Sequence, residues 1–165
     1  MNQIVYQSIG TIRTPFKELS GMPIQPRGDQ SAKGELVVDP AYEPGLRDIE
    51  GFSHLILIYH FHKSRGFELT VKPFLDDHHR GVFATRAPRR PNAIGLSIVS
   101  LLERSGNVLR VGGIDVADQT PLLDIKPYVP MFDAPEATAI GWLEGKAENF
   151  REKKSDRRFL KQSDS

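Results

Sequence analysis

The chain contains no cysteine among its 165 residues. This absence excludes disulfide bonds, catalysis by a thiolate and zinc sites built on cysteine, and it agrees with a reducing cytoplasm. Long apolar runs are missing too, because none approaches the roughly 20 residues that span a bilayer. The first residues also lack the basic and apolar segments of a signal peptide. We therefore expect a soluble, cytoplasmic protein that has no membrane partner.

An excess of charge of either sign is also lacking. The 22 Lys and Arg residues balance 21 Asp and Glu residues, which leaves a net charge of +1. This balance does not by itself indicate a nucleic-acid-binding protein, so a polyanion would need a local basic patch. A chain of this length forms one domain and buries roughly 70% of the surface of its unfolded state. We assign residues 1–145 to this domain and residues 146–165 to a charged C-terminal helix or tail.

Helices of roughly 10–15 residues that alternate with strands are absent, which argues against a doubly wound nucleotide-binding fold. The chain instead shows short β-prone runs separated by Gly, Pro and Asp. This pattern predicts a mostly β protein, a small antiparallel-rich barrel or sandwich with few helices. Strands are expected at residues 4–14, 34–38, 54–61, 82–85, 96–103, 108–116 and 122–128, with a short helix at 42–50 and a terminal helix at 142–153.

The segment 81–97 carries three arginines on a backbone stiffened by prolines. Proline fixes φ and removes a donor, so the loop stays out of helices and sheets, and a guanidinium can bind a carboxylate or phosphate and stack on a base. A solvated connection is the alternative interpretation, but apolar runs on both sides and the special backbone geometry typical of Asn92 and Gly95 favour an anchored site. We expect Arg89, Arg90 and Asn92 to contact the substrate or RNA. The three arginines are Arg86, Arg89 and Arg90, and the prolines are Pro88 and Pro91.

A second group of polar residues follows the run 118–121, whose Asp-Gln-Thr-Pro sequence is typical of a β-turn. Asp124, Lys126 and Tyr128 have a spacing of two, so on a strand they project from one face. An acid, a base and a phenol are costly to bury unless they pair or bind a ligand. From these residues alone, structural pairing and ligand binding are both open.

Histidines make a third group. His60, His62 and His78, with Asp76, offer imidazole and carboxylate groups of the kind that bind zinc or iron. The chain has no HExxH pattern, however, and adjacent His-His and Asp-Asp pairs point in different directions. Satisfied histidines at strand ends are the better interpretation, so we expect no metal. A hydrolase with a histidine-bound metal ranks third among the candidate functions.

Four motifs lie in order along most of the chain, from about residue 9 to residue 142. They are IGTIRTPF at 9–16, EGFSHL at 50–55, the arginine segment 81–97 and the run 120–130. Together they resemble the TsaA/TrmO family of S-adenosylmethionine-dependent tRNA methyltransferases, and several motifs in order are a far stronger signal than one. The resemblance implies a compact, closed or nearly closed β-barrel with short helices, not the common Rossmann methyltransferase fold. It also implies a homodimer with the cofactor near the subunit interface.

The resemblance further implies the reaction, which is N6-methylation of threonylcarbamoyladenosine on the 3′ side of the anticodon of certain tRNAs. The acceptor nitrogen belongs to a urea and is a poor nucleophile, so a placed base would help. Asp124 and Tyr128 are our candidate catalytic groups, with Lys126 orienting phosphate or the threonine carboxylate. By resemblance, the contacts to S-adenosylmethionine are Gln25, Pro26, Arg27, His62, Lys63, Arg86, Leu96, Asp118, Gln119, Thr120 and Pro121.

The chain departs from the family pattern at Ala93, where the family usually has a second proline, and residues 75–80 match no known pattern. Some family members also carry a second, C-terminal domain. The alternative from another class is a non-catalytic barrel that binds nucleotide or RNA through basic and aromatic residues. Its aromatic platform has little support, because Phe, Tyr and Trp make up 8% of the chain and mostly lie in core-like runs.

Overall fold

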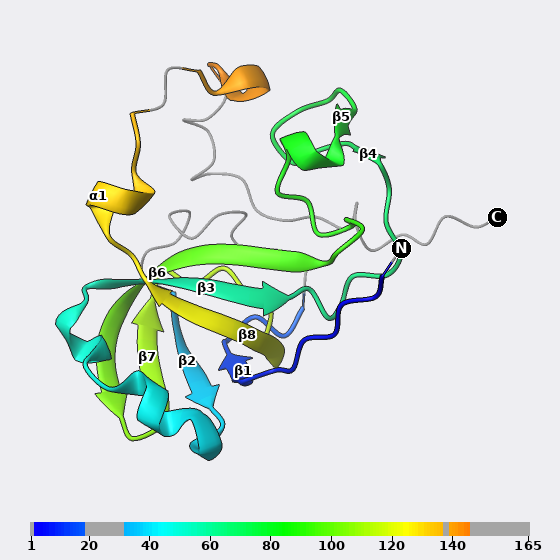
Figure 1. The fold of residues 1–165 in the computed structure, drawn as a ribbon. Coiled ribbons are helices and arrows are strands. Elements are labelled where there is room, and N and C mark those ends of the chain that lie inside the picture. Colours follow the sequence, from blue (N-terminus) through cyan, green and yellow to red (C-terminus); the bar gives the residue numbers. More distant parts are fainter. Residues whose placement is uncertain (1, 19–31, 137–138, 146–165) are drawn as a thin grey trace.

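The computed structural model describes residues 2–18, 32–136 and 139–145. Six strands close into a barrel in the order β1-β2-β7-β6-β3-β8, and every neighbouring pair is antiparallel. Figure 1 shows β6, β3 and β8 side by side along one side of this barrel. The mostly β, closed antiparallel barrel predicted from the sequence is confirmed. The barrel strands are β1 (Gly10–Arg13), β2 (Lys33–Val38), β3 (His54–His60), β6 (Ile94–Ser105), β7 (Val108–Gly112) and β8 (Thr120–Pro127).

The central strand β3 shows how the sequence builds the barrel wall. Leu55, Leu57 and Tyr59 point into the barrel and are buried, because side chains alternate between the two faces of a strand. Ile56 and Ile58 point outward, where they are only partly covered by residues of β6 and β8. The nearly continuous apolar run of β3 therefore faces the buried interior of the barrel on one side and a partly covered outer surface on the other.

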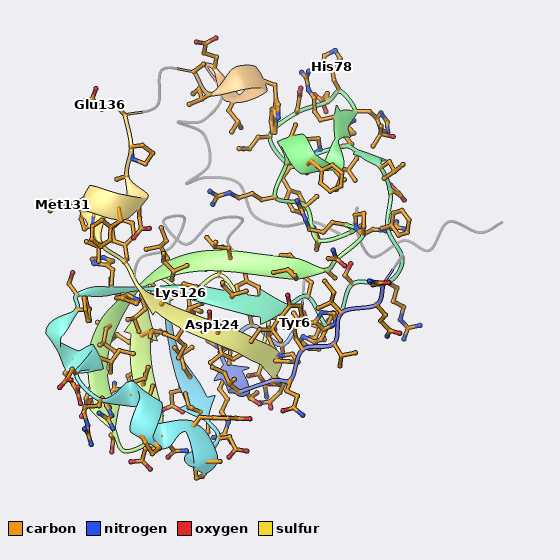
Figure 2. All side chains as sticks on the ribbon, viewed as in Figure 1. Tyr6, His78, Asp124, Lys126, Met131 and Glu136 are labelled. Carbon is orange, nitrogen blue, oxygen red and sulfur yellow. The ribbon has the colours of Figure 1, made fainter. Side chains whose placement is uncertain are left out.

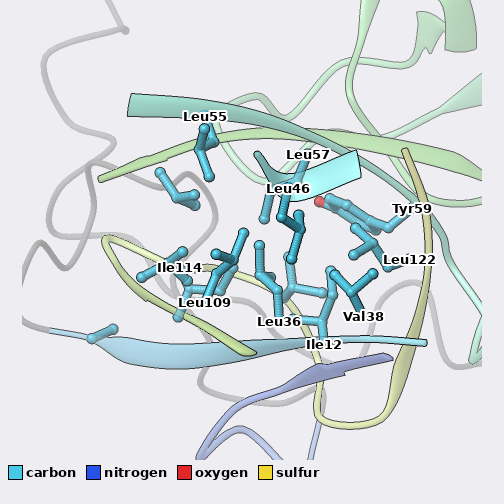
Figure 3. Close-up of a cluster of buried hydrophobic side chains, with 14 residues drawn as sticks. Ile12, Leu36, Val38, Leu46, Leu55, Leu57, Tyr59, Leu109, Ile114 and Leu122 are labelled. Atoms are coloured by element: carbon cyan, nitrogen blue, oxygen red, sulfur yellow. The ribbon is translucent and has the colours of Figure 1, made fainter. Parts of the chain in front are cut away.

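The barrel interior is one cluster of aliphatic side chains with a single aromatic ring (Figure 3). Ile12, Leu36, Leu57, Leu109 and Leu122 come from five different strands and are fully buried. Each such side chain contributes about 1.5–3 kcal/mol by leaving water. The core therefore joins the strands from within, and the barrel ends and outer faces remain for other roles.

The chain between β3 and β6 forms a separate excursion. Its strands β4 (Thr70–Val71) and β5 (Arg80–Gly81) pair with each other as a two-stranded sheet, and the 3-10 helix η4 (Val82–Ala84) follows. Figure 1 shows this unit beyond the tip of β3, outside the barrel. Its own small buried cluster consists of Val71, Val82 and Ala87.

The strand predicted at residues 82–85 is wrong, because this segment forms η4. The turn is closed by the Thr85 hydroxyl, which donates to the carbonyl of Val82 at 2.8 Å. Phe83 points to solvent with 76% of its surface exposed. The segment has β-prone residues, but the described strands offer it no pairing partner, and β propensity is expressed only through such neighbours.

The short helix predicted at residues 42–50 is replaced by two 3-10 helices, η2 (Pro40–Leu46) and η3 (Ile49–Gly51). Pro44 lies inside η2 and cannot donate to a helical ladder. Asp48, between the two, has a left-handed φ of 67°, which an α-helix cannot contain. The backbone therefore stays in short turns.

Other boundaries also differ from the prediction. The first strand begins only at Gly10, and β7 ends at Gly112 because Gly113 has a left-handed φ of 71°. A hairpin turn joins β6 to β7, and its Gly106 has a left-handed φ of 58°. Of the predicted terminal helix at 142–153, the first two residues lie in η5 (Gly141–Leu143) and residues 144–145 form a turn, so this part is not an α-helix. Residues 146–153, like the rest of the tail at 146–165, lie outside the described residues. Between β8 and η5 the chain makes one turn of α-helix, α1 (Pro130–Asp133).

Candidate functional site

One end of the barrel brings together the segments that carry most of the candidate residues. β3 ends there, and the connection from β7 to β8 crosses it. β6 begins there after the residues 82–93 that carry the three arginines, which we call the arginine loop. Thr14 joins these parts, because its N–H donates to Asp118 Oδ1 at 3.0 Å and its hydroxyl donates to the carbonyl of Val116 at 2.8 Å. The Asp118 N–H donates in turn to the carbonyl of Phe16 at 2.8 Å. In Figure 1 this end, which we call the site end, lies at the tip of the β3 arrow.

Asp118 is held as an ionised carboxylate at the site end. The hydrogen bond from the Thr14 amide is the main reason that the pKa of Asp118 is below its usual value. The next residue, Gln119, has a left-handed φ of 62°, which lets the chain turn sharply into β8. Asp118 is only partly buried, so its remaining acceptor capacity is open to a hydroxyl or amine of a ligand.

His62 is fixed by the first residue of β8. The Thr120 hydroxyl donates its single proton to the carbonyl of Ala117 at 2.8 Å. The contact of 3.1 Å between Thr120 Oγ1 and His62 Nδ1 therefore requires His62 to donate. Burial, together with the charge of Lys63, lowers the pKa of His62. The neutral ring thus carries its proton on Nδ1 and offers Nε2 as an acceptor.

Arg90 braces the arginine loop from within, and Arg89 ties the loop to the chain that follows β3. Arg90 Nη1 donates to the carbonyls of Thr85 and Ala87 at 3.0 and 3.2 Å, so this side chain braces the loop from within. Arg89 pairs with Glu68 at 2.8 Å, and its side chain is only 11% exposed. Arg86, in contrast, is exposed. Asn92 is exposed as well, and its carbonyl accepts the N–H of Ile94 at 2.7 Å in the tight turn before β6.

A buried polar chain lies beneath the site end, and the sequence reasoning missed it. The Ser97 hydroxyl donates to Asp115 Oδ1 at 2.6 Å and is 3.0 Å from the Tyr59 hydroxyl. Burial raises the pKa of Asp115 to about 6. Burial also raises the pKa of Tyr59 well above its usual value. The missed signal was a Ser inside the apolar run of β6, at the position facing the barrel interior.

Asp124 and Lys126 share the outer face of β8, as their spacing predicts. The register between β3 and β8 skips Leu123, so Leu122 points inward beside Tyr59, whereas Asp124 points outward beside Ile58. Asp124 and Lys126 form an ion pair of 2.7 Å with both side chains substantially exposed. Figure 2 shows the two residues along the outside of β8.

Tyr128 lies just beyond the far end of β8. Its ring contacts His54, the first residue of β3, in an edge-on arrangement with centroids 6.3 Å apart. His62 and Thr120 lie at the opposite ends of these two strands. Within one chain the structure therefore does not bring Tyr128 to the site end. Leu96, also on the outer wall, is 49% exposed and pairs with Ile58.

The histidines do not form a metal site among the described residues. That part of the chain contains no group of three or more His, Cys, Asp or Glu side chains placed to hold a metal ion. Asp76 instead forms an ion pair with Arg80, with 2.7 Å between Oδ2 and Nη2, and its Oδ1 lies 3.3 Å from His78 Nδ1. The predicted cofactor contacts Gln25, Pro26 and Arg27 lie outside the described residues. No helix among residues 2–18, 32–136 and 139–145 is long and apolar enough to cross a membrane.

Comparison with known proteins identifies the family. The sequence profile described as the tRNA-methyltransferase O N-terminal domain matches residues 11–134. The chain therefore belongs to the TrmO family, and the family predicted from the four motifs is confirmed.

Individual relatives support the same family. The chain is 51% identical over 157 residues to a probable S-adenosyl-L-methionine-binding protein of Pyrococcus abyssi, a match that covers 95% of this chain and 85% of that protein. It is 39% identical over 150 residues to the tRNA (adenine(37)-N6)-methyltransferase of Escherichia coli strain K12, covering 84% and 64%. A crystal structure of TrmO from Pseudomonas aeruginosa has 37% identity and a TM-score of 0.72, covering 86% and 63%. The chain thus spans just under two thirds of the two bacterial proteins.

Proposed function

We propose that this protein is an S-adenosylmethionine-dependent methyltransferase that methylates N6 of an adenosine in tRNA in the cytoplasm. The observation that carries the proposal is the family match over residues 11–134, which contains all of the barrel except the first residue of β1, and the site end with it. Relatives of the family are described as S-adenosyl-L-methionine-binding proteins and as tRNA (adenine(37)-N6)-methyltransferases. The ionised Asp118 and the exposed Arg86 give the site end the polar groups that such a cofactor requires.

The cofactor would be held at the site end of the barrel. S-adenosylmethionine has ribose hydroxyls and an amino group that suit the Asp118 carboxylate, a carboxylate that suits Arg86, and an adenine that suits apolar and main-chain contacts. His62 and Thr120 lie in the same wall. The other expected contacts are Gln25, Pro26, Arg27, Lys63, Leu96, Gln119 and Pro121. When bound, the cofactor supplies the methyl group on a sulfonium, whose positive charge is lost in the transfer, so a site without strong negative charge around the sulfur favours the reaction.

The acceptor in the proposal is threonylcarbamoyladenosine beside the anticodon. Its N6 bears one hydrogen and a carbamoyl group, and positioning that nitrogen in line with the donor supplies much of the rate. The threonyl carboxylate and the phosphates of the anticodon loop need cationic partners, and Lys126, Arg89 and Arg90 stay our candidates with Asn92. Asp124 and Tyr128 stay the candidate acid–base groups from the sequence reasoning.

The proposed assembly is a homodimer. The outer wall of β6 presents three aliphatic side chains in a row at alternate positions, and all three are substantially exposed. This row continues across β3 into the half-buried Ile56 and Ile58. A second copy packed on this wall would cover it and would bring its own Asp124 and Lys126 close to the contact. The exposed row consists of Ile94, Leu96 and Ile98.

A methyl-transfer assay tests the proposed activity. The purified chain is incubated with methyl-labelled S-adenosylmethionine and with two versions of one tRNA, with and without the threonylcarbamoyl group on the adenosine beside the anticodon. The proposal predicts a methylated nucleoside only from the modified tRNA, identified by mass spectrometry of the digested product. Methylation of both versions would overturn the assigned acceptor. Binding of tRNA without cofactor binding or transfer would favour the non-catalytic RNA-binding barrel.

A further inference from the structure

Three side chains under the site end form a hydrogen-bond chain with a fixed direction. The Ser97 hydroxyl donates to Asp115 Oδ1 at 2.6 Å. A serine hydroxyl has one proton, so the Tyr59 hydroxyl must be the donor in its 3.0 Å contact with Ser97 Oγ. Both protons thus point towards Asp115, an arrangement that favours an ionised carboxylate. Asp115 keeps part of its surface exposed, so its carboxylate can still meet a ligand.

The arginine segment contains the residues that make this chain possible. Gly95 and Tyr59 are cross-strand partners. A Cβ at position 95 would lie 2.2 Å from Tyr59 Cε2, so only glycine lets the ring lie against β6 and reach Ser97. Gly95 and Ser97 are not among the expected cofactor or substrate contacts. The structure gives them another role, because Gly95 makes room for Tyr59 and Ser97 hydrogen-bonds to the Asp115 carboxylate.

Asp115 lies in the same part of the chain as the proposed cofactor turn. It belongs to the connection between β7 and β8, directly before Val116, which accepts the Thr14 hydroxyl at the site end. The positive charge of Arg86 is close enough to lower the pKa of both Asp115 and Tyr59. The arginine loop, the predicted cofactor turn and this carboxyl group therefore share one end of the barrel.

We propose that Asp115 is the proton acceptor of the methyl transfer, held in place by Ser97 and Tyr59. The inference rests on the proposed function. In the step, the acceptor N6 attacks the methyl carbon, the bond from carbon to sulfur breaks, and its electron pair leaves with the sulfur as a neutral thioether. The N6–H proton passes to the Asp115 carboxylate, which later releases it to water. Charge balances, because a cationic sulfonium and a carboxylate become a thioether and a carboxylic acid.

The surroundings of Asp115 suit this role at neutral pH. Burial raises the pKa of Asp115 to about 6. Three groups act in the opposite direction and limit this rise, namely the Ser97 hydroxyl, the main-chain N–H of Asp115 itself and the Arg86 guanidinium. Among the described residues, the charged or titratable groups that act on the carboxyl are Arg86 from the arginine loop and Tyr59 from β3. A carboxylate with this pKa is ionised at pH 7 but remains a stronger base than an exposed aspartate. Methyl transfer should rise with pH as Asp115 loses its proton.

Asp124, the acid chosen from the sequence, is the competing proton acceptor. It is ion-paired with Lys126 on the outer wall, and the ammonium group competes for the carboxylate oxygens. Asp115 lies in the connection between β7 and β8 at the site end, and its described hydrogen bonds and ion pairs include no lysine. The geometry of a single chain therefore favours Asp115.

The first test measures single-turnover methyl transfer to threonylcarbamoylated tRNA. Asp115→Asn keeps the size and removes the base, so the rate should fall by at least about 100-fold, while the dissociation constant for S-adenosylmethionine, measured by calorimetry, changes by less than about threefold. A rate within about threefold of wild type would overturn the proposal. A wild-type enzyme that transfers no methyl group would overturn the proposed function and this inference together, whereas an active wild type with an unaffected variant overturns only the inference.

The second test uses the pH profile, because Asp115→Asn could simply damage the fold. Ser97→Ala removes one stabilising hydrogen bond from the carboxylate, so the acidic limb of the rate should move up by about one pH unit, with the rate restored at high pH. Ser100→Ala, a serine on the same strand whose hydroxyl faces His54 on the outer wall, is the matched control and should leave the limb unchanged. A limb that stays in place in Ser97→Ala, or that disappears in Asp124→Asn, would contradict the role of Asp115.

Discussion

Gly95 and Tyr59 face each other across β6 and β3, and the tyrosine ring fills the space that a side chain at position 95 would need. The ring is thereby directed past the β6 backbone to Ser97. Gly95 of the arginine segment thus determines where the ring of Tyr59, on β3, can lie. This relationship links the motif to the interior of the barrel.

The contact gives a first prediction for stability. Gly95→Ala should lower the free energy of unfolding by about 1–3 kcal/mol, because the new methyl group overlaps the Tyr59 ring. Urea unfolding followed by fluorescence measures the change. Gly81→Ala is the matched control, since nothing lies within 4 Å of a Cβ built there, and it should stay within about 0.5 kcal/mol of wild type. Equal stability of the two variants would refute the close contact.

The second prediction concerns the protonation of His62. The ring should be neutral at pH 7, with a titration midpoint below 6.5, because burial and Lys63 disfavour its charged form. Nitrogen NMR of the imidazole should show the proton on Nδ1, as the hydrogen bond to Thr120 requires. Thr120→Val removes this acceptor and should shift the population towards the other tautomer. A proton found on Nε2 in the wild-type protein would contradict the assigned hydrogen-bond direction.

A third prediction separates a bracing arginine from an ordinary surface arginine. Arg90→Ala should cost about 2 kcal/mol of unfolding free energy, because two loop carbonyls lose a charged donor. It should also weaken cofactor binding through the loosened loop. Arg110→Ala breaks an exposed ion pair with Glu103 and should cost less than about 1 kcal/mol. Similar losses in the two variants, in chemical unfolding and in calorimetry, would argue against the bracing role.

The fourth prediction concerns the proposed dimer. Leu96→Glu places a charge in the exposed apolar row of β6 and should convert the dimer into monomers, because an unpaired carboxylate is costly to bury in an interface. Light scattering during gel filtration measures the mass. Leu69→Glu alters a leucine outside the barrel wall that is more exposed than Leu96, and it should leave the dimer intact. A wild-type chain that runs as a monomer at all concentrations would exclude the assembly.

The barrel could be predicted from the sequence because its signals are local. Alternating apolar residues, turn residues such as Gly106 and the order of motifs all act over a few positions. Residues 82–85 misled the prediction because they have the composition of a strand without a neighbour to pair with. The skipped Leu123, which turns Asp124 outward, depends on the register between β3 and β8 and leaves no mark in the sequence.

The candidate site was predictable only in part, because some of its contacts also depend on strand register and not on local sequence. The turn at Asp118 and the arginine loop could be found from their residue types, and the structure places them at the same end of the barrel. The chain from Tyr59 through Ser97 to Asp115 joins three segments that are distant in sequence. Its members look like ordinary core and loop residues until their register is known. The bracing role of Arg90 likewise depends on the path of the loop backbone.

Calorimetric titration with S-adenosylmethionine tests the central claim most directly, namely that the site end is the methyl-donor site. We predict micromolar binding by the wild-type chain, a free energy of about −8 kcal/mol, that is abolished in Arg86→Ala and unchanged in Arg110→Ala. Folding of each variant is verified by circular dichroism. No binding by the folded wild-type chain would contradict the claim, and so would binding that Arg86→Ala leaves intact.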